Sequence, residues 1–425
     1  MRITINTFGT RGDVQPYLAL GIELKNRGHQ VKLLTHQIFE GFAQQYGITV
    51  HPLDLDPKQI LLQQSLADIG GGNWRITRWL VENFQWVLDD LFRATLDAAR
   101  EADLIINSGI SLAGWHVAEK LDLPAIAAYL WPVTPTRELP GVNAKPLPGW
   151  IPCQGIYNRI STKAFNQFFF YLLSPLINTC RAEILGLPPL SMGDYWPLDN
   201  PRTHTPLLYG FSQAVIPKPA EWTGWQQITG YWWLPPAEPY QPPLELESFL
   251  AAGPKPISIG FGSMVDHERD TITQMVVEAL KLSGQRGVLL GGWSELGEGI
   301  LPEQVIRLES VPHDWLFPRT AGVVHHGGAG TTAAGLRAGV PAVVIPNFAD
   351  QFFWGNRIQQ LRAGPKPIPR QHLSVEKLAG AIQSILKDPG YQNRAAQLGD
   401  TIRAEMGVMR AVDLVERFGE EGIFP

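Results

Sequence analysis

Short apolar segments alternate with helical segments along most of this chain, and that alternation constrains its fold more than any other feature. Residues 3–8 are typical of a strand, residues 14–27 repeat their apolar side chains at helical spacing, and residues 31–34 return to a strand pattern. Gly28 stands where a glycine commonly ends a helix. Strands that alternate with helices form a parallel sheet with helices on both faces. The sequence therefore predicts an α/β fold with a doubly wound sheet.

This alternation stops in the middle of the chain and then resumes. Before the break, the predicted elements are helices at 79–100 and 114–120 and strands at 104–106 and 125–129. Residues 131–256 hold proline-rich stretches, aromatic clusters and one helical region at 162–185. After the break, the predicted elements are strands at 256–260, 287–290, 323–324 and 342–345, a helix at 271–282 and amphipathic helices within 374–418. Two α/β sandwiches are therefore expected.

Length and proline content predict where the chain divides. Its 425 residues are enough for two large domains or three ordinary ones. Residues 235–243 contain five prolines, which permit only extended backbone and are typical of a linker. The predicted division is an N-terminal domain over 1–234, a linker over 235–255, a C-terminal domain over 256–400 and a final segment over 401–425. We expect a substrate cleft between the two domains.

Charge and composition exclude several classes of protein. The net charge is -5 and no basic cluster is visible, so nucleic acid is not an expected partner. Cys153 and Cys180 form neither a disulfide framework nor a metal-binding pair, which fits a reducing cytoplasm. The chain opens on a strand rather than a signal peptide, and its longest apolar stretch, 168–173, is far shorter than the roughly 20 residues of a membrane span. A cytoplasmic protein, with at most peripheral membrane contact, is expected; its oligomeric state stays open.

A glycine-rich turn follows the predicted strand at 323–324. Residues 325–332 read HHGGAGTT and lead into a helical segment. Glycines allow a ligand to approach the backbone, and a helix N-terminus carries partial positive charge, so this turn suits a phosphate or pyrophosphate. Its spacing fits neither a Walker A loop nor a dinucleotide fingerprint. His326 could donate to a phosphate oxygen; the alternative is a structural turn with a satisfied histidine.

Two further loops lie at predicted strand ends. Asp350 and Gln351 follow the strand at 342–345 and suit adjacent sugar hydroxyls, although Asp350 could instead cap a helix beginning near residue 352. Asp13 follows the first strand and could act as a general base or as the N-cap of a helix beginning at Val14. Arg11 could bind phosphate or be a solvated surface charge.

Together these stretches resemble the sterol glucosyltransferase branch of the nucleotide-sugar glycosyltransferases of the family 1 type, and the antibiotic-aglycone glycosyltransferases of actinobacteria. The main motifs are GTRGDVQP at 9–16 and HHGGAGTT at 325–332. The further matches are TGYWW at 229–233, FGSM at 261–264, VPHDWL at 311–316, PNFADQ at 346–351 and WGN at 354–356. They follow the family order from residue 2 to about 370, so the resemblance covers nearly the whole chain.

The resemblance implies the GT-B fold, in which two doubly wound Rossmann-like domains face each other across a cleft. It implies that the C-terminal domain holds most of the sugar donor. The nucleoside would lie beside Val311 and His313, and Trp293 would border the base unless that indole only packs in the core. The residues implied for the diphosphate are Ser263, His326, Ala329, Gly330 and Thr331.

The same resemblance assigns roles at the sugar and at the acceptor. Asp350 and Gln351 would bind the sugar hydroxyls. Thr10 and Arg11 would reach the donor from the N-terminal domain, and Asp13 would lie at the acceptor hydroxyl. The last helix, within 401–425, would pack back on the N-terminal domain.

These roles imply an inverting transfer without a metal or other cofactor. An acceptor oxygen attacks the anomeric carbon, the nucleoside diphosphate leaves, and the glycine loop with His326 stabilises its charge. Asp13 takes the acceptor proton, in the place where many plant relatives use a histidine just after the first strand. His116 and His36 are candidates for a partner histidine that no motif supports. The resemblance favours UDP-glucose as donor and leaves a dTDP-sugar open.

The acceptor is expected to be a lipophilic alcohol or phenol. Trp131 and Phe169 are the candidate pocket residues, with plain core packing as the alternative. Residues 131–137 are similar to a stretch in sterol-transferring relatives, but Pro135 and the continuation at 138–141 depart from it. Two alternatives are a nucleotide-sugar epimerase or phosphorylase, whose extra acids or second anion site the sequence does not show, and a catalytically silent nucleotide-sugar-binding module.

Overall fold

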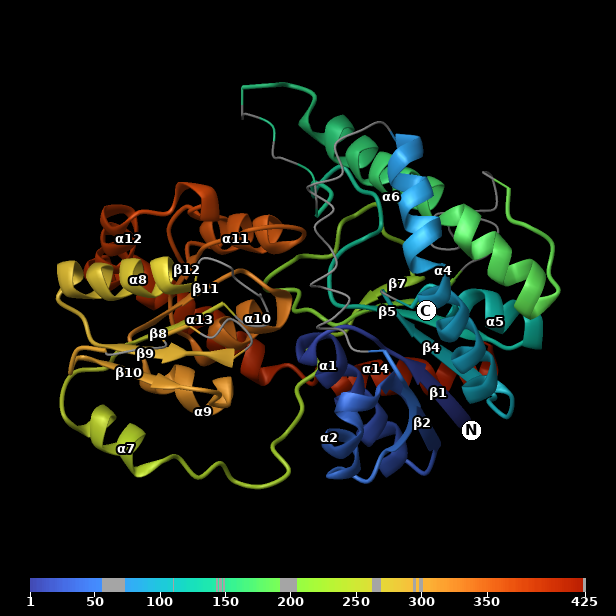
Figure 1. Ribbon diagram of the computed structural model, residues 1–425, viewed down its shortest axis with the longest axis horizontal. Helices are drawn as coiled ribbons and strands as arrows, with labels where there is room; N and C mark the ends of the chain where they lie inside the picture. The colour runs from blue at the N-terminus through green and yellow to red at the C-terminus, as the bar shows by residue number, and fades with distance from the viewer. Residues whose placement is uncertain are drawn as a thin grey trace. The chain divides into compact units, whose positions relative to one another are not determined.

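The computed structural model describes residues 1–55, 73–109, 111–142, 144, 147, 150–191, 205–261, 269–292, 296–297 and 301–422. These residues form two compact units (Figure 1). One consists of Met1–Gln213, Pro217–Ala237 and Met406–Pro425, and the other of Ala214–Ile216 and Glu238–Glu405. Each unit is built on one parallel sheet, which confirms the predicted α/β class.

The first unit contains a seven-stranded sheet of order β3-β2-β1-β4-β5-β6-β7, with every pair parallel. Its strands are β1 (Arg2–Asn6), β2 (Gln30–His36), β3 (Thr49–Leu53), β4 (Leu104–Ser108), β5 (Ala125–Tyr129), β6 (Leu207–Tyr209) and β7 (Gln226–Ile228). Its helices are α1 (Arg11–Asn26), α2 (Glu40–Gln44), α4 (Asn73–Ala99), α5 (Gly114–Leu121), α6 (Gln154–Cys180) and α14 (Gly407–Glu421).

Alternate side chains of this sheet enter two different cores, as the period of a strand requires. Leu104 and Ile106 of β4 pack with α1 and α14 on one face. Ile105, between them, packs with α4, α5 and α6 on the other face. Helices therefore cover both faces of the sheet, which makes it doubly wound.

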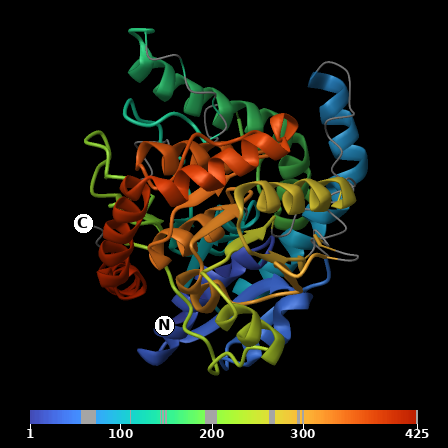
Figure 2. The ribbon, with the colours of Figure 1, turned by 90° about the vertical axis from the view of Figure 1, so that its left-hand side faces the viewer.

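The second unit contains a five-stranded parallel sheet of order β10-β9-β8-β11-β12. Its strands are β8 (Ile257–Gly260), β9 (Gly287–Leu290), β10 (Val305–Leu308), β11 (Gly322–His325) and β12 (Ala342–Val344). Its helices are α7 (Leu244–Ala251), α8 (Arg269–Ser283), α9 (His313–Leu316), α10 (Ala329–Ala338), α11 (Gln351–Gln360), α12 (Val375–Lys387) and α13 (Pro389–Ala404). Helices α8 and α12 share one core with β8, β9, β11 and β12, and Figure 2 views this unit with both helices toward the reader.

The segment expected as a linker contains a helix. Residues 235–243 have neither helix nor strand, and α7 begins directly after Pro243. Among the described helices, none is both long enough and apolar enough to span a bilayer.

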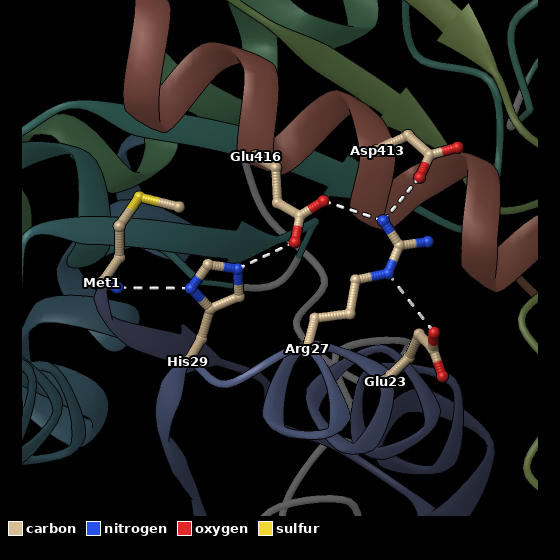
Figure 3. A network of polar contacts seen from close by, with 6 residues as sticks. All are labelled: Met1, Glu23, Arg27, His29, Asp413 and Glu416. Carbon is tan, nitrogen blue, oxygen red and sulfur yellow. Dashed lines mark hydrogen bonds and ion pairs between the residues drawn. The ribbon is translucent and has the colours of Figure 1, made fainter.

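The final helix, α14, packs on α1 within the first unit and adds charged contacts to its apolar face. Arg27 Nη1 donates to Asp413 Oδ1 at 2.6 Å and to Glu416 Oε2 at 2.8 Å. His29 Nε2 lies 3.0 Å from Glu416 Oε1. Figure 3 shows how the Arg27 guanidinium lies between these carboxylates and that of Glu23. Charge and apolar packing therefore both attach α14 to the first unit.

Candidate active site

In each sheet the strand order reverses at one point, and each predicted loop follows a strand beside that point. In the first unit β1 lies between β2 and β4, and residues 9–13 follow β1. In the second unit β8 lies between β9 and β11, and residues 326–332 follow β11. Open α/β sheets bind ligands beyond the carboxyl ends of strands at such switch points. Each unit therefore places its predicted loop where a ligand site is expected.

Asp13 is the third residue of α1 and not its N-cap. The helix begins at Arg11 with Thr10 as N-cap, so the alternative of a cap before Val14 is wrong. Asp13 Oδ2 accepts bonds from the Thr10 backbone N–H at 2.8 Å and from Thr10 Oγ1 at 2.9 Å. This is the reciprocal bond of a capping box, in which a side chain at the third position binds back to the N-cap.

Two opposing effects act on the Asp13 carboxyl. Burial of this half-buried group raises its pKa above the ordinary value, and the two bonds from Thr10 lower it, with burial the larger effect. A carboxylate with a raised pKa is a stronger base once it is ionised. The chemistry available at this position is therefore proton acceptance from a nearby hydroxyl.

His36 positions the loop that carries Asp13. Its Nδ1 lies 2.7 Å from the Leu55 carbonyl oxygen and must donate, because a carbonyl can only accept. Nε2 is then the acceptor for the Gly9 N–H, at 3.0 Å. Gly9 has φ +107°, and a side chain there would place its Cβ 2.6 Å from Asp13 Oδ2. The loop thus needs glycine at residue 9 and is tied to the end of β2.

The other polar candidates near this loop have different surroundings. Arg11 is exposed, with its guanidinium carbon 4.7 Å from the centre of the Phe42 ring. His116, a candidate partner for Asp13, instead stacks on Phe92, and its Nδ1 lies 3.0 Å from Arg181 Nη1. Burial and the adjacent Arg181 charge lower the pKa of His116 to about 4.

In the second unit, His325 organises the glycine-rich turn. Its Nδ1 accepts the Gly327 N–H at 3.1 Å, so the ring proton is on Nε2. Gly327 has φ +96°, and a Cβ there would lie 2.8 Å from both the Gln351 carbonyl oxygen and Val344 Cγ1. Burial, with the adjacent histidines, lowers the pKa of His325 to about 3. Sequence reasoning missed this role, although the position of His325 at the end of a buried strand was a usable signal.

His326 lies over the N-terminus of α10. A Cβ on Gly328, the N-cap, would come within 2.5 Å of His326 Nε2. Burial, followed by the charge of nearby His313, lowers the pKa of His326 to about 4, so the ring is neutral at pH 7. Among the described residues its Nδ1 is buried without a hydrogen-bond partner. A neutral imidazole and a helix N-terminus therefore lie together.

The residues implied for the diphosphate and nucleoside fall into three groups. Ala329, Gly330 and Thr331 form the first turn of α10, where they are exposed or half-buried and the N–H groups suit an anion. Val311 is buried, and His313 begins α9 and stacks on Phe317 with ring centres 4.4 Å apart. Ser263 and Trp293 lie outside the described residues.

Asp350 and Gln351 both hold the loop between β12 and α11. Asp350 occupies the N-cap position of α11, but its Oδ2 accepts from the Trp354 indole at 2.9 Å rather than from a capping N–H. Gln351 is buried, and its Oε1 accepts from the backbone N–H of Asn347 at 2.8 Å and of Phe348 at 3.3 Å. Ala349, directly before Asp350, has φ +52°. The side chains thus hold a tight turn at the edge where a sugar was predicted.

The two candidate acceptor residues have different environments. Trp131 is half-buried and stacks on Tyr129. A Cβ on Gly109, the residue directly after β4, would lie 2.9 Å from Trp131 Cζ2. Phe169 is 40% exposed and stacks on Phe165, whereas the buried ring of that helical turn is Phe170. Trp131 therefore lies at the carboxyl edge of the sheet, and Phe169 lies on the outer face of α6.

Known domain families match both parts of the chain. Residues 3–140 match the glycosyltransferase family 28 N-terminal domain, and residues 293–412 match the erythromycin biosynthesis protein CIII-like C-terminal domain. The chain is 36% identical over 428 residues to a sterol 3-beta-glucosyltransferase of Pichia angusta. The alignment covers 97% of this chain and 33% of that protein. The chain thus spans about a third of the length of that relative.

Solved structures share the fold at low identity. The glycotransferase of kitacinnamycin is 19% identical, with a TM-score of 0.70 and 98% of both chains covered. The glycosyltransferase VinC, solved in complex with dTDP, is 18% identical, with a TM-score of 0.65 over 99% of this chain and 100% of that one. The chain therefore has the GT-B fold, with a glycosyltransferase family 28 N-terminal domain and an erythromycin CIII-like C-terminal domain.

Proposed function

We propose that this protein is an inverting, metal-independent glycosyltransferase that moves a hexose from a UDP-sugar to a hydroxyl of a lipophilic acceptor and forms a β-glycoside. Glucose is the proposed hexose. The observation that carries the proposal is the 36% identity to a sterol 3-beta-glucosyltransferase along 97% of this chain.

The donor diphosphate is proposed to bind at the first turn of α10. Backbone N–H groups of Ala329, Gly330 and Thr331 would bind the phosphate oxygens, and the helix dipole would stabilise the charge that develops on the leaving group. His326, neutral at pH 7, would donate one further hydrogen bond. This arrangement supplies donors without a bound cation, and no cofactor other than the nucleotide sugar is proposed.

Asp13 is proposed as the general base. Both bonds from Thr10 go to Oδ2, so Oδ1 is the oxygen assigned to the proton. The acceptor oxygen forms a bond to the anomeric carbon as the bond between that carbon and the phosphate oxygen breaks. The hydroxyl proton passes to Asp13, and UDP leaves. Attack opposite the leaving group inverts an α-linked donor to a β-glycoside.

The acceptor is proposed to lie against Trp131 at the carboxyl edge of the first sheet. That indole packs against Gly109, directly after β4. Because β4 is the neighbour of β1, the indole lies on the side of the sheet edge where the loop of Asp13 begins. An aromatic wall close to a single base suits a large apolar alcohol such as a sterol. Phe169 is left out of this pocket because it lies on an exposed helix face.

Nucleotide binding and transfer test the proposal separately. A ligand at a hundredfold excess over Kd raises the free energy of unfolding by about 2.7 kcal/mol, which a thermal-shift measurement detects. We expect a shift with UDP and UDP-glucose and none with ATP or NAD. Transfer from UDP-glucose to a sterol or a phenol is then followed by product chromatography, with excess EDTA expected to leave the rate unchanged.

Asp13→Asn separates an enzyme from a silent binding module. We expect it to retain UDP binding and to lose about 10²- to 10⁴-fold in transfer rate, the usual range for a general base. UDP binding without transfer in either protein would favour a binding module. EDTA inhibition that Mg²⁺ or Mn²⁺ reverses would contradict the metal-free leaving-group step.

A further inference from the structure

Helix α6 exposes an apolar face that the proposed chemistry does not use. Of the fifteen exposed large apolar side chains among the described residues, seven fall between residues 150 and 171. Ile156, Ile160 and Phe168 recur at multiples of four residues and Tyr171 follows three later, so they share one side of the helix. They are between 42% and 58% exposed. A continuous apolar stripe therefore runs along the outside of α6, the long green helix of Figure 1.

The opposite side of α6 holds the helix firmly on the first unit. Leu176 and Ile177 enter the core beneath α4 and α5. Asn158 Nδ2 donates to the Arg137 carbonyl oxygen at 3.0 Å, and Asn166 Nδ2 donates to the Val133 carbonyl oxygen at 3.4 Å. The helix cannot rotate to bury the stripe without breaking these contacts.

The charges beside the stripe are positive. Residues 154–180 contain no Asp or Glu, and their charged residues are Arg159 and Lys163, both exposed. Among the described residues, Arg159 pairs with Glu221, whose Oε1 lies 4.0 Å from Arg159 Nη1 and 3.5 Å from Arg137 Nε. Trp150, just before the helix, is 82% exposed. Aromatic side chains with flanking cations are the composition of helices that lie in the plane of a bilayer interface.

We propose that the outer face of α6, with Trp150, docks on the surface of a lipid bilayer that contains anionic lipid. The helix would lie in the interface with its stripe among the acyl chains and with Arg159 and Lys163 at the headgroups. Its 27 residues span about 40 Å, enough to present the whole stripe at once. This docking requires no sugar transfer, so it stands or falls independently of the proposed function.

Vesicle co-sedimentation of the full chain tests the proposal. The probes are vesicles of phosphatidylcholine mixed with phosphatidylglycerol, and vesicles of phosphatidylcholine alone. We expect the wild type to sediment with the mixed vesicles, and Ile160→Ser with Phe168→Ser to lower the partition coefficient about tenfold or more. Leu282→Ser, which removes a side chain that is 56% exposed on α8 of the other unit, is the matched control and should bind like the wild type.

A charge variant and an oligomer measurement complete the test. Lys163→Glu should weaken binding to the mixed vesicles while leaving the apolar stripe intact, and thermal denaturation should show all variants folded. Equal sedimentation of the wild type and the double serine variant, or none for either, would overturn the proposal. So would light scattering that shows a dimer dissociated by the serine substitutions, because the stripe would then be a contact between copies of this chain.

Discussion

The hydrogen bond that His36 accepts from the Gly9 N–H predicts that a residue outside the reaction controls its rate. His36→Phe keeps a ring of similar size but removes both nitrogens. The Gly9 N–H and the buried Leu55 carbonyl then lose their partner, at about 1–3 kcal/mol for each unsatisfied group. We expect the free energy of unfolding to fall by about 2–6 kcal/mol. The Gly9 loop, released from β2, would shift Asp13 away from the acceptor.

The effect on catalysis should separate from the effect on donor binding. A displacement of about 1 Å in a reacting group can cost about a hundredfold in rate, and we expect that loss in kcat. The donor KM should change little, because the residues proposed to hold the donor belong mainly to the second unit. Initial rates of UDP release, with UDP affinity measured by calorimetry, give both quantities.

Two conservative variants identify which bond of His36 matters. His36→Gln places an amide at the reach of Nε2 and can accept from Gly9, whereas His36→Asn places one at the reach of Nδ1 and can donate to Leu55. We expect Gln to restore kcat and Asn to restore stability alone. Wild-type kcat in a folded His36→Phe protein, or equal rescue of kcat by Asn and Gln, would refute a positioning role.

Three further predictions concern the base, the donor site and the final helix. Thr10→Val removes a hydroxyl that lowers the pKa of Asp13, so that pKa should rise and the acid limb of the pH profile of kcat should move to higher pH; an unmoved limb would argue against Asp13 as the base. His326→Ala should weaken UDP binding about tenfold to a hundredfold by calorimetry; unchanged affinity would place the diphosphate elsewhere. Arg27→Met removes a guanidinium shared by two carboxylates of α14, so the free energy of unfolding in urea should fall by about 1 kcal/mol, and by less at high salt. Equal urea midpoints for the two proteins would mean that apolar packing alone holds the helix.

Strands that consist of a buried apolar run could be predicted from the sequence. Strands such as β4 and β9 are nearly continuous apolar runs, so their composition identifies them without any partner. The strands that the prediction missed lie at or next to sheet edges: β3, β6, β7 and β10. β7 reads QQI, and β3 contains Pro52, which an edge position tolerates. Such strands depend on pairing with their neighbours, which a local pattern does not contain.

The loops of the candidate site could be predicted, but their supports could not. Glycines and polar residues directly after buried strands indicated residues 9–13 and 325–332 from the sequence alone. The group that holds residues 9–13 comes from elsewhere, because His36 lies at the end of β2. That contact depends on the order of the strands in the sheet, which spacing along the chain does not specify. The Trp354 indole that donates to Asp350 lies one helical turn away, so this contact depends on where α11 begins.

Asp13 shows why local patterns left two readings open at this site. A carboxylate near the start of a helix satisfies backbone N–H groups, and the same residue near a substrate accepts protons, so the sequence permits cap or base. In the structure one oxygen makes the capping-box bonds to Thr10, and the other is the one assigned to the acceptor proton. Those bonds lower the pKa while burial raises it more. The cap thus orients the carboxylate and opposes the rise in its pKa, while burial makes it more basic, so the structural role of Asp13 is compatible with its proposed chemical role.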